Sequence, residues 1–295
     1  MIYIFLNLIK AINIFSNFNS VNSKNFIPLC YGSLKSVEEF QYAFCISDIC
    51  NLLKKLKKLG TKLVKRGKRK VPMYCFGSTV GVARTPRILV EKKMIFIPRP
   101  YRFFKPISSK RVEFEKMNDL RVFAHFVEKI TLEYLQIVKE EWATEAYSYL
   151  LLSKKITPSS CLIMDTGFNF MSLNGDMGDS DEGIQNHVDD QDYVNLVLHL
   201  GTCTSGGCTI FCKYLPNRDK PRKIFEVPFE HGTFQISRFS HILHGTDKWK
   251  GVRCSLNFGL KKKVLNFFKC YGTYHYKKHI VDEKYILKNE IIEMK

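Results

Sequence analysis

Leucines at helical spacing predict an amphipathic helix between residues 46 and 64. Apolar residues recur there every three or four positions, and lysines occupy most of the positions between them. Such spacing places the apolar side chains on one side of a helix and the charged ones on the other. The apolar stripe consists of Leu52, Leu53, Leu56, Leu59 and Leu63.

Two further helices are predicted in the middle of the chain. Asn118 and Asp119 offer an N-cap for a helix that runs to about residue 129, and Thr131 with Glu133 predicts the start of a second one. The second helix is expected to end near residue 152, before the sequence "SKKITPSS". Neither pattern carries candidate chemistry, so both helices are expected to form a layer packed outside a sheet.

Short β-rich runs predict strands on both sides of these helices. Residues 72–106 alternate such runs with turn signals, and turns such as "TSGG" and "DKWKG" separate further runs after Ser160. Many short strands with Gly-rich turns favour a sandwich or a barrel, and the added helices make the fold class α+β. The later strands are expected at residues 161–173, 193–200, 208–214, 223–227, 233–239 and 254–260.

Charge adds a preference for anionic partners. The 295 residues include 45% hydrophobic and 25% charged ones, as in a folded globular protein, and the net charge is +18. Such an excess favours phosphate backbones or anionic membrane surfaces. Residues 54–70 hold ten basic residues and no acid. This segment reads either as a solvated helix face with a charged linker, or as a nucleic-acid contact or nuclear-import patch.

Cysteine usage and the apolar N-terminus indicate the cellular compartment in which the protein is expected. Ten cysteines without a CxxC pair indicate a reducing, intracellular environment. Cys203, Cys208 and Cys212 are close enough in sequence to consider zinc, but a β-like run favours ordinary packing. Residues 1–18 are expected to form a packed or peripheral helix, with a signal anchor as the alternative, and no other segment approaches a membrane span.

The candidate chemistry begins at His187 and Asp189. On an extended strand, residues i and i+2 point to the same face, so this imidazole and carboxylate could bind one ion. Chance alone supplies about 0.3 such triplets in a chain of this composition, so the pair by itself is weak evidence. His244, followed by a glycine, adds a second imidazole, and two His with one carboxylate suit non-haem Fe(II).

A nearby arginine is suited to bind the carboxylate of an organic acid. Arg253 lies on the last predicted strand, and its guanidinium can bind a carboxylate with two parallel hydrogen bonds. Ser255 follows on the same face of that strand and can add a hydroxyl group. Gly206 and Gly207 form a turn before the run "CTIF", between the two halves of the candidate site.

This ordered set resembles the core of the Fe(II)/2-oxoglutarate dioxygenases. The match spans about residues 168–258 and reads HxD, then GG, then HG, then RxS. The resemblance implies a double-stranded β-helix, a jelly-roll or cupin-like barrel with supporting helices outside it. It also implies Fe(II), 2-oxoglutarate and O2, with His187, Asp189 and His244 as metal ligands, and Arg253 and Ser255 on the C5 carboxylate of 2-oxoglutarate.

Within this superfamily the pattern is most similar to the ten-eleven-translocation and J-binding-protein branch, which oxidises methylated pyrimidine bases. That branch shares an Asn-bearing strand before HxD, a second acid soon after it, and the step "LG…GG". AlkB-like repair enzymes share an Asn before HxD, matched here by Asn174. Their final motif typically carries two arginines, whereas this chain has one. Prolyl hydroxylases share the pattern of Gly206, Gly207, Thr209 and Phe211, but usually carry Lys at the position of Arg253.

Several neighbours compete for roles in the site. His241 is the rival of His244, although the following Gly245 favours His244. Asp190 and Asp192 are rivals of Asp189 and are expected to be loop residues. Asn195 and His199 share a strand face; we assign Asn195 to co-substrate binding, with a structural polar pair as the alternative. Asn174 could reach the pocket or form a turn with Gly175. His275 and His279 lie in a Tyr- and Lys-rich tail, which is expected to be surface.

The sequence therefore favours an oxygenase that acts on nucleic acid. The expected division is an N-terminal apolar segment with a basic helix and linker (1–71), an oxygenase domain (72–270, with the core at about 161–262) and a basic tail (271–295). We expect oxidation of a C–H bond, on a methyl group of a nucleic-acid base, in the nucleus or cytoplasm. The alternatives are a prolyl- or lysyl-type protein hydroxylase and a non-catalytic β-barrel binding module.

Overall fold

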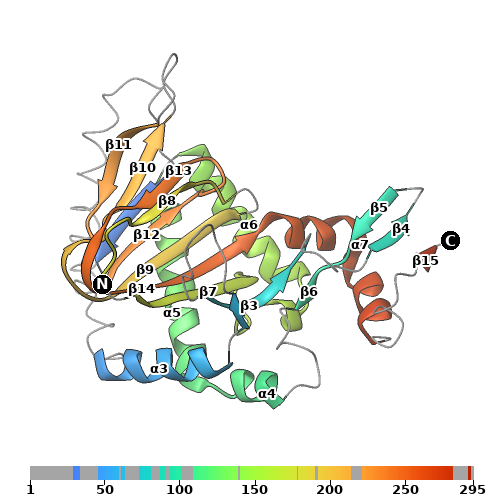
Figure 1. Cartoon of the computed structure of the whole chain (residues 1–295). Coiled ribbons are helices and arrows are strands. Elements are labelled where there is room, and N and C mark those ends of the chain that lie inside the picture. Colours follow the sequence, from blue (N-terminus) through green and yellow to red (C-terminus); the bar gives the residue numbers. More distant parts are fainter. Residues whose placement is uncertain are drawn as a thin grey trace.

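The structure is a computed structural model of the chain, shown in Figure 1. It describes residues 29–33, 46–59, 61–63, 73–80, 87–90, 93–100, 109–138, 140–177, 179–189, 192–213, 221–281 and 292–293. The apolar run 1–18 and the basic cluster Lys65–Lys70 lie outside these residues. No helix in the described ranges is both long and apolar enough to cross a membrane.

The largest element is an eight-stranded antiparallel sheet. Its long central strands are β9 (Asp192–Gly206) and β14 (Trp249–Lys261), which pair with each other along most of their length. β12 (Thr233–Ser237) and β1 (Leu29–Ser33) extend the sheet beyond β9. The strands beyond β14 are β7 (Phe170–Met177), β3 (Met73–Thr79), β2 (Thr61–Leu63) and, paired with β3, β6 (Arg99–Pro100).

A four-stranded antiparallel sheet lies beside β9 and β12 in Figure 1. Its order is β11 (Arg222–Val227), β10 (Thr209–Lys213), β13 (Leu243–Thr246) and β8 (Ile184–His187). A third, small sheet joins β4 (Arg87–Val90), β5 (Lys93–Phe96) and β15 (Ile292–Glu293). Among the described strands, no pairing joins the four-stranded sheet to the eight-stranded one. The α+β class is therefore confirmed, whereas the expected barrel is not closed.

Helices cover one face of the eight-stranded sheet. α5 (Asn118–Ile137) and α6 (Glu141–Ile156) pack there, as do leucines of α3 (Ile46–Leu59). Phe123 of α5 lies 6.1 Å from Phe258 of β14, measured between ring centroids. α4 (Ser109–Glu115) contributes Phe114 to the same core, and α7 (Lys262–Val281) continues directly from β14.

The two faces of this sheet differ in polarity because side chains alternate along each strand. The face under the helices carries Leu196 and Leu198 of β9, and Leu256 and Phe258 of β14, all buried in the main core. The opposite face, toward the four-stranded sheet, carries polar residues at the alternate positions. They include Ser172, Asn174, Asn195, Gln235, Arg253, Ser255 and Asn257.

The helix predictions placed several boundaries wrongly. α5 continues through Thr131 to Ile137, because the hydroxyl of Thr131 bonds to the carbonyl of Val127 and does not cap a new helix. The capping residue of α5 is Met117, so Asn118 is the first helical residue and not the cap. The helix predicted at 46–64 ends at Leu59, and Leu63 belongs to strand β2.

Most predicted strands are present with shifted limits. The strand expected from Cys161 begins only at Phe170, because residues 159–161 form a 3-10 helix and Met164 and Asp165 adopt positive φ. β9 and β14 extend well beyond their predicted ends. α7 spans the position where the tail was expected to begin, and its backbone is kinked at Gly272.

Candidate functional site

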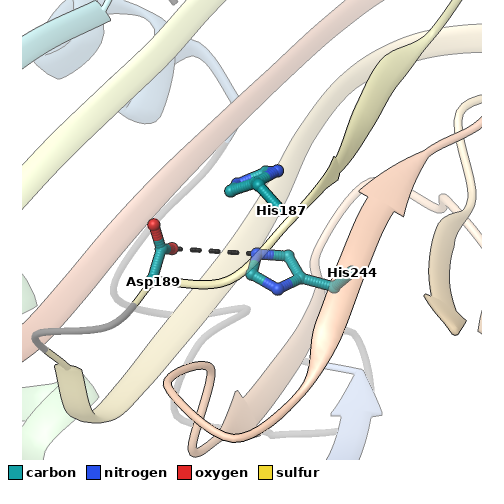
Figure 2. A group of neighbouring side chains, drawn as sticks. All are labelled: His187, Asp189 and His244. Atoms are coloured by element: carbon teal, nitrogen blue, oxygen red, sulfur yellow. Dashed lines mark ion pairs between the residues drawn. The ribbon is translucent and has the colours of Figure 1, made fainter. Parts of the chain in front are cut away.

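His187, Asp189 and His244 come together at one point between the sheets. One ligand atom from each residue lies within 4.8 Å of the others, and this is the one group of three potential metal ligands in the described residues. Figure 2 shows the three side chains directed toward one another. The His244 Nε2 atom lies 3.7 Å from the Asp189 Oδ2 atom, and the His244 side chain is 10% exposed.

Pairing of β8 with β13 places the two imidazoles opposite each other. His187 and His244 are directly paired in the ladder, and their ring centroids are 4.4 Å apart. Directly opposed residues of an antiparallel pair project to the same face, so both rings reach one site. The ring of Phe239 lies 4.5 Å from that of His244 and closes the site on one side.

Asp189 reaches the site from outside a strand. β8 ends at His187, so the expectation that both residues lie on one extended strand is wrong in its local geometry. The Asp189 backbone is instead held by two hydrogen bonds. Its N–H donates to the carbonyl of Phe239 (3.2 Å), and its carbonyl accepts from the N–H of Asp192 (3.1 Å).

Both histidines use Nδ1 for a backbone contact. The Nδ1 atom of His187 lies 2.9 Å from the carbonyl oxygen of Gln185, and that of His244 lies 3.0 Å from the carbonyl oxygen of Ile242. A neutral imidazole in this contact carries its proton on Nδ1 and leaves the lone pair on Nε2. This arrangement orients an imidazole for metal binding, because the hydrogen bond fixes the tautomer and the ring.

The group opens into a pocket between the two sheets. The pocket is lined by the three residues of the group and by the polar face of the eight-stranded sheet. It therefore contains Arg253, Ser255, Asn174 and Asn195, all of which were considered from the sequence. Asn174 lies within β7, so the interpretation as a turn with Gly175 is wrong.

Arg253 is a buried cation that forms no ion pair with the described residues. It is 3% exposed, and no carboxylate in the described part of the chain forms an ion pair with it. Its Nε donates to the carbonyl of Gly207 (3.2 Å), and the rings of Phe229 and Trp249 flank its guanidinium at 5.4 and 5.7 Å. Burial lowers the pKa of Arg253 to about 10, which leaves it protonated at neutral pH.

Ser255 and His199 complete the surroundings of Arg253. The amide nitrogen of Asn174 lies 3.4 Å from the Ser255 hydroxyl. His199 is fully buried, and burial together with the nearby Arg253 lowers its pKa well below the usual value, so the ring is neutral. Its Nε2 lies 3.4 Å from the hydroxyl of Thr209, which also accepts from the amide of Gln235 at 3.1 Å.

Several buried polar atoms along the pocket lack a partner among the described residues. They are Asn195 Oδ1, Gln235 Oε1 and Asn257 Oδ1. Buried polar atoms in folded proteins are almost always hydrogen-bonded, to protein, water or ligand. Their number on one polar face marks this pocket as a place for a polar ligand.

Asp192 and Asn195 occupy the other end of the pocket. Asp192 was expected in a loop, but it is the first residue of β9 and is 1% exposed. Its carboxylate pairs with the ammonium of Lys261 and accepts a hydrogen bond from the amide of Asn195. Asn195 thus lines the pocket while holding Asp192, and its binding to a co-substrate stays a prediction.

The other candidates do not join the group. His241 is exposed, and its N–H bonds to the carbonyl of Arg238 in a turn. Asp190 lies outside the described residues, and the side chains of His275 and His279 are not described. The three cysteines considered for zinc form no metal-binding group in the described ranges, where the amide of Asn186 donates to the sulfur of Cys212.

Sequence reasoning missed several polar residues that line the pocket. Gln235, Asn257 and Lys261 were not singled out, although each lies on a strand that was recognised. The alternation of polar and apolar residues in "RCSLNFGLK" already places Arg253, Ser255 and Asn257 on one face. Extending that alternation along the strand would have found Lys261 as well.

Comparisons with known proteins identify no sequence relative. No protein-family model matches the chain, and no curated protein matches it. Similar solved structures exist, but at low identity. One is NgTET1 in complex with 5mC DNA, with a TM-score of 0.48, 10% identity, and coverage of 82% of this chain and 75% of that one.

Two further structures show the same kind of distant similarity. A 2OG-Fe(II) oxygenase family oxidoreductase from Burkholderia pseudomallei gives a TM-score of 0.39 at 12% identity, covering 85% of this chain and 91% of that one. A prolyl 4-hydroxylase from Phytophthora capsici gives 0.25 at 15%, covering 31% and 32%. All three are similarities of fold at 10–15% identity.

Proposed function

We propose that this chain is an Fe(II)- and 2-oxoglutarate-dependent dioxygenase. The observation that carries the proposal is the placement of two complementary groups in one pocket. His187, Asp189 and His244 form a potential metal site, and Arg253, a buried cation that forms no ion pair with the described residues, lines the same pocket.

The three side chains fit Fe(II). Two imidazoles and one carboxylate form the ligand set of non-haem Fe(II) oxygenases, which leaves metal positions open for other ligands. Because each Nδ1 atom contacts a backbone carbonyl, the neutral ring carries its lone pair on Nε2, the atom that would bind the metal. The ligand atoms already lie within 4.8 Å of one another. His187, Asp189 and His244 would therefore hold the metal.

Arg253 and Ser255 fit the distal carboxylate of 2-oxoglutarate. A guanidinium binds a carboxylate through two parallel charge-assisted hydrogen bonds, and burial strengthens them. A buried, unpaired arginine is costly unless a ligand supplies the negative charge. Phe229, Trp249 and the Gly207 carbonyl fix the guanidinium, while Asn174 contacts the Ser255 hydroxyl.

The protein's task in this reaction is to bind, orient and exclude water. When bound, Fe(II) with 2-oxoglutarate and O2 supplies an oxidant for a substrate C–H bond, while 2-oxoglutarate is converted to succinate and carbon dioxide. His199 stays neutral beside Arg253 and so does not compete with it for the carboxylate. The ring of Phe239 covers His244 and shields that ligand from solvent.

We take the two facing sheets as the two halves of a double-stranded β-helix. The ladders β12–β9–β14–β7 and β11–β10–β13–β8 each hold four neighbouring antiparallel strands, and the pocket lies between them. On this proposal, the core of the oxygenase domain is the region of about residues 161–262, within the domain 72–270 suggested by the sequence.

A methyl group on a nucleic-acid base is the substrate that we propose. Support comes from the motif resemblance to the base-oxidising branch and from the net charge of +18. The basic cluster Lys65–Lys70 supplies further phosphate attraction and suits a nuclear or cytoplasmic location. An enzyme acting on a base in a duplex must extrude it, and the pocket would receive the extruded base.

The first experiment measures 2-oxoglutarate turnover. The purified chain with Fe(II) and ascorbate should form succinate, detected by NMR, and His187→Ala or Asp189→Ala should lower the rate by a factor of at least about 100. His241→Ala is the matched control, because this exposed histidine lies outside the group, and it should keep the wild-type rate. Absence of succinate from the wild type, with all candidate substrates present, would contradict the proposal.

The second experiment identifies the substrate. Mass spectrometry of nucleosides after incubation with methylated DNA or RNA should show an added oxygen on the modified base. Nucleic-acid binding should weaken steeply with salt, and neutralising Lys65–Lys70 should weaken it further. Hydroxylation of a proline- or lysine-containing peptide, with no change in any base, would instead identify a protein hydroxylase.

A further inference from the structure

Asp189 is the one ligand of the proposed metal site that lies outside a strand. His187 and His244 are fixed by the β8–β13 ladder, but Asp189 follows the end of β8. Its carbonyl accepts a hydrogen bond from the N–H of Asp192 at 3.1 Å. The position of Asp192 therefore helps to determine where the Asp189 carboxylate lies.

Asp192 is anchored by a buried ion pair with Lys261. β9 and β14 place the two residues opposite each other, and the ammonium of Lys261 contacts the carboxylate of Asp192. The side chain of Asp192 is 1% exposed and that of Lys261 is 15% exposed. Water therefore screens this pair much less than a surface pair.

Lys261 is itself held from two sides. Its backbone N–H donates to the side-chain oxygen of Asn169 at 2.8 Å, and its carbonyl accepts from the Asn169 amide at 3.4 Å. The Lys261 Nζ atom lies 4.2 Å from the ring centroid of Phe170, a cation–π contact. The ammonium is therefore a fixed point to which the start of β9 is tied.

We propose that Lys261 is a positioning residue for the metal ligand Asp189 and acts through Asp192. This inference rests on the proposed metal site. Without the ammonium, Asp192 would be a buried carboxylate without its cationic partner, which is strongly unfavourable. The start of β9 would then shift to expose or protonate Asp192, and the hydrogen bond that holds the Asp189 carbonyl would be strained or lost.

Electrostatics alone predicts the opposite change in metal affinity when Lys261 loses its charge. Removing a positive charge close to a cation site should tighten metal binding by Coulomb attraction alone. Loss of positioning should weaken it. The sign of the change in metal affinity therefore separates the two.

The experiment is a titration with Co(II), an air-stable probe for Fe(II), followed by its visible absorption. Lys261→Met should weaken Co(II) binding by about 10- to 100-fold, as is typical for residues that orient metal ligands. Lys261→Arg should stay within about threefold of the wild type because it keeps the charge. Lys262→Met is the control: this neighbouring lysine is exposed, and its loss should leave Co(II) affinity unchanged.

A fourth variant covers the case in which Lys261→Met does not fold. Asp192→Asn/Lys261→Met keeps the backbone N–H of residue 192 but carries no buried charge, so it should fold. Its Co(II) affinity should stay within about tenfold of the wild type and, where the single variant is measurable, exceed that of Lys261→Met. A double variant that folds but binds Co(II) more than about 100-fold more weakly would overturn the proposal.

Three further outcomes would overturn the proposed role of Lys261. Unchanged or tighter Co(II) binding in folded Lys261→Met would overturn the positioning role while leaving the metal site intact. The same conclusion would follow if that variant bound Co(II) normally and lost only turnover, because Lys261 would then act on the substrate. A wild type that binds neither Co(II) nor Fe(II) would overturn the proposed metal site, and this inference with it.

Discussion

His187 and His244 face each other across the β8–β13 ladder with their ring centroids 4.4 Å apart. Each ring contacts, through Nδ1, a backbone carbonyl two residues earlier in its own chain segment. The strand pairing therefore fixes the separation of the rings, and the carbonyls fix their orientation. Strand pairing and backbone contacts thus position two of the three proposed ligands.

Gly245 allows this close approach of the two strands, and replacing it should disturb the site. A Cβ atom at this position would lie 2.4 Å from the side-chain oxygen of Asn186 and 2.7 Å from the carbonyl oxygen of Ile184. Gly245→Ala should therefore push β8 away from β13, lower the free energy of unfolding by about 1–3 kcal/mol and weaken Co(II) binding by about tenfold or more.

A second glycine provides the control for Gly245. Gly251 of β14 adopts a φ of 92°, so Gly251→Ala should also destabilise the fold, but Gly251 does not line the pocket. Urea unfolding and Co(II) titration of both variants should show two destabilised proteins, only one of which has lost affinity. Equal Co(II) affinity in the two variants would mean that the β8–β13 spacing does not determine the site.

Arg253 should determine the affinity for 2-oxoglutarate. Arg253→Lys keeps the charge but loses the two-pronged geometry, so KM for 2-oxoglutarate should rise by about 10- to 100-fold. Arg253→Met should raise it further. Arg222→Met, a change of an exposed arginine on β11, is the control and should leave KM unchanged. The role assigned to Arg253 fails if Arg253→Met retains a KM within about twofold of wild type.

The period-two alternation of the strands made much of this site predictable. Arg253 and Ser255 alternate with Cys254 and Leu256, so the sequence alone separates a pocket face from a core face. The order of His187, Asp189 and His244 then suggested one ion site, and the structure brings these three together. The local sequence pattern was sufficient to predict these residues because both the alternation and the motif are short-range signals.

Long-range pairing explains what the sequence did not reveal. Asp192 was expected in a loop because the acids beside it resemble a turn, and its partner Lys261 lies on a strand far along the chain. The same limit applies to the boundary at Thr131. A Thr followed by an acid resembles a helix start, but packing of α5 along the sheet keeps the helix continuous.

The helical layer should affect stability without affecting the site. Glu128 of α5 is buried, accepts a hydrogen bond from the N–H of Gly167 (2.6 Å) and pairs with Lys154 of α6 (2.8 Å). Glu128→Ala would leave that N–H without its partner, so the free energy of unfolding should fall by about 2–4 kcal/mol. Glu141→Ala, at an exposed position of α6, should change it by less than about 0.5 kcal/mol.

Metal binding separates this supporting role from a role in the site. Under conditions where Glu128→Ala is fully folded, its Co(II) affinity should equal that of the wild type. A loss of affinity in the folded variant would show that α5 transmits its position to the pocket through β9 and β14.

His199 should make the stability of the fold depend on pH in a defined direction. In an unfolded chain, histidine has a pKa of about 6.5. Burial and the neighbouring Arg253 hold the pKa of His199 well below that value in the fold. Below about pH 6.5 the unfolded chain therefore binds a proton that the folded chain does not, and the free energy of unfolding falls by up to about 1.4 kcal/mol per pH unit.

Replacing this histidine should remove its share of the pH dependence. His199→Gln cannot take up the proton, so its free energy of unfolding should fall less steeply between about pH 6.5 and 5 than that of the wild type. Urea unfolding at several pH values measures both slopes. Parallel slopes for wild type and His199→Gln would mean that His199 is protonated in the folded protein, in which case it could not remain as a neutral neighbour of Arg253 in the proposed co-substrate site.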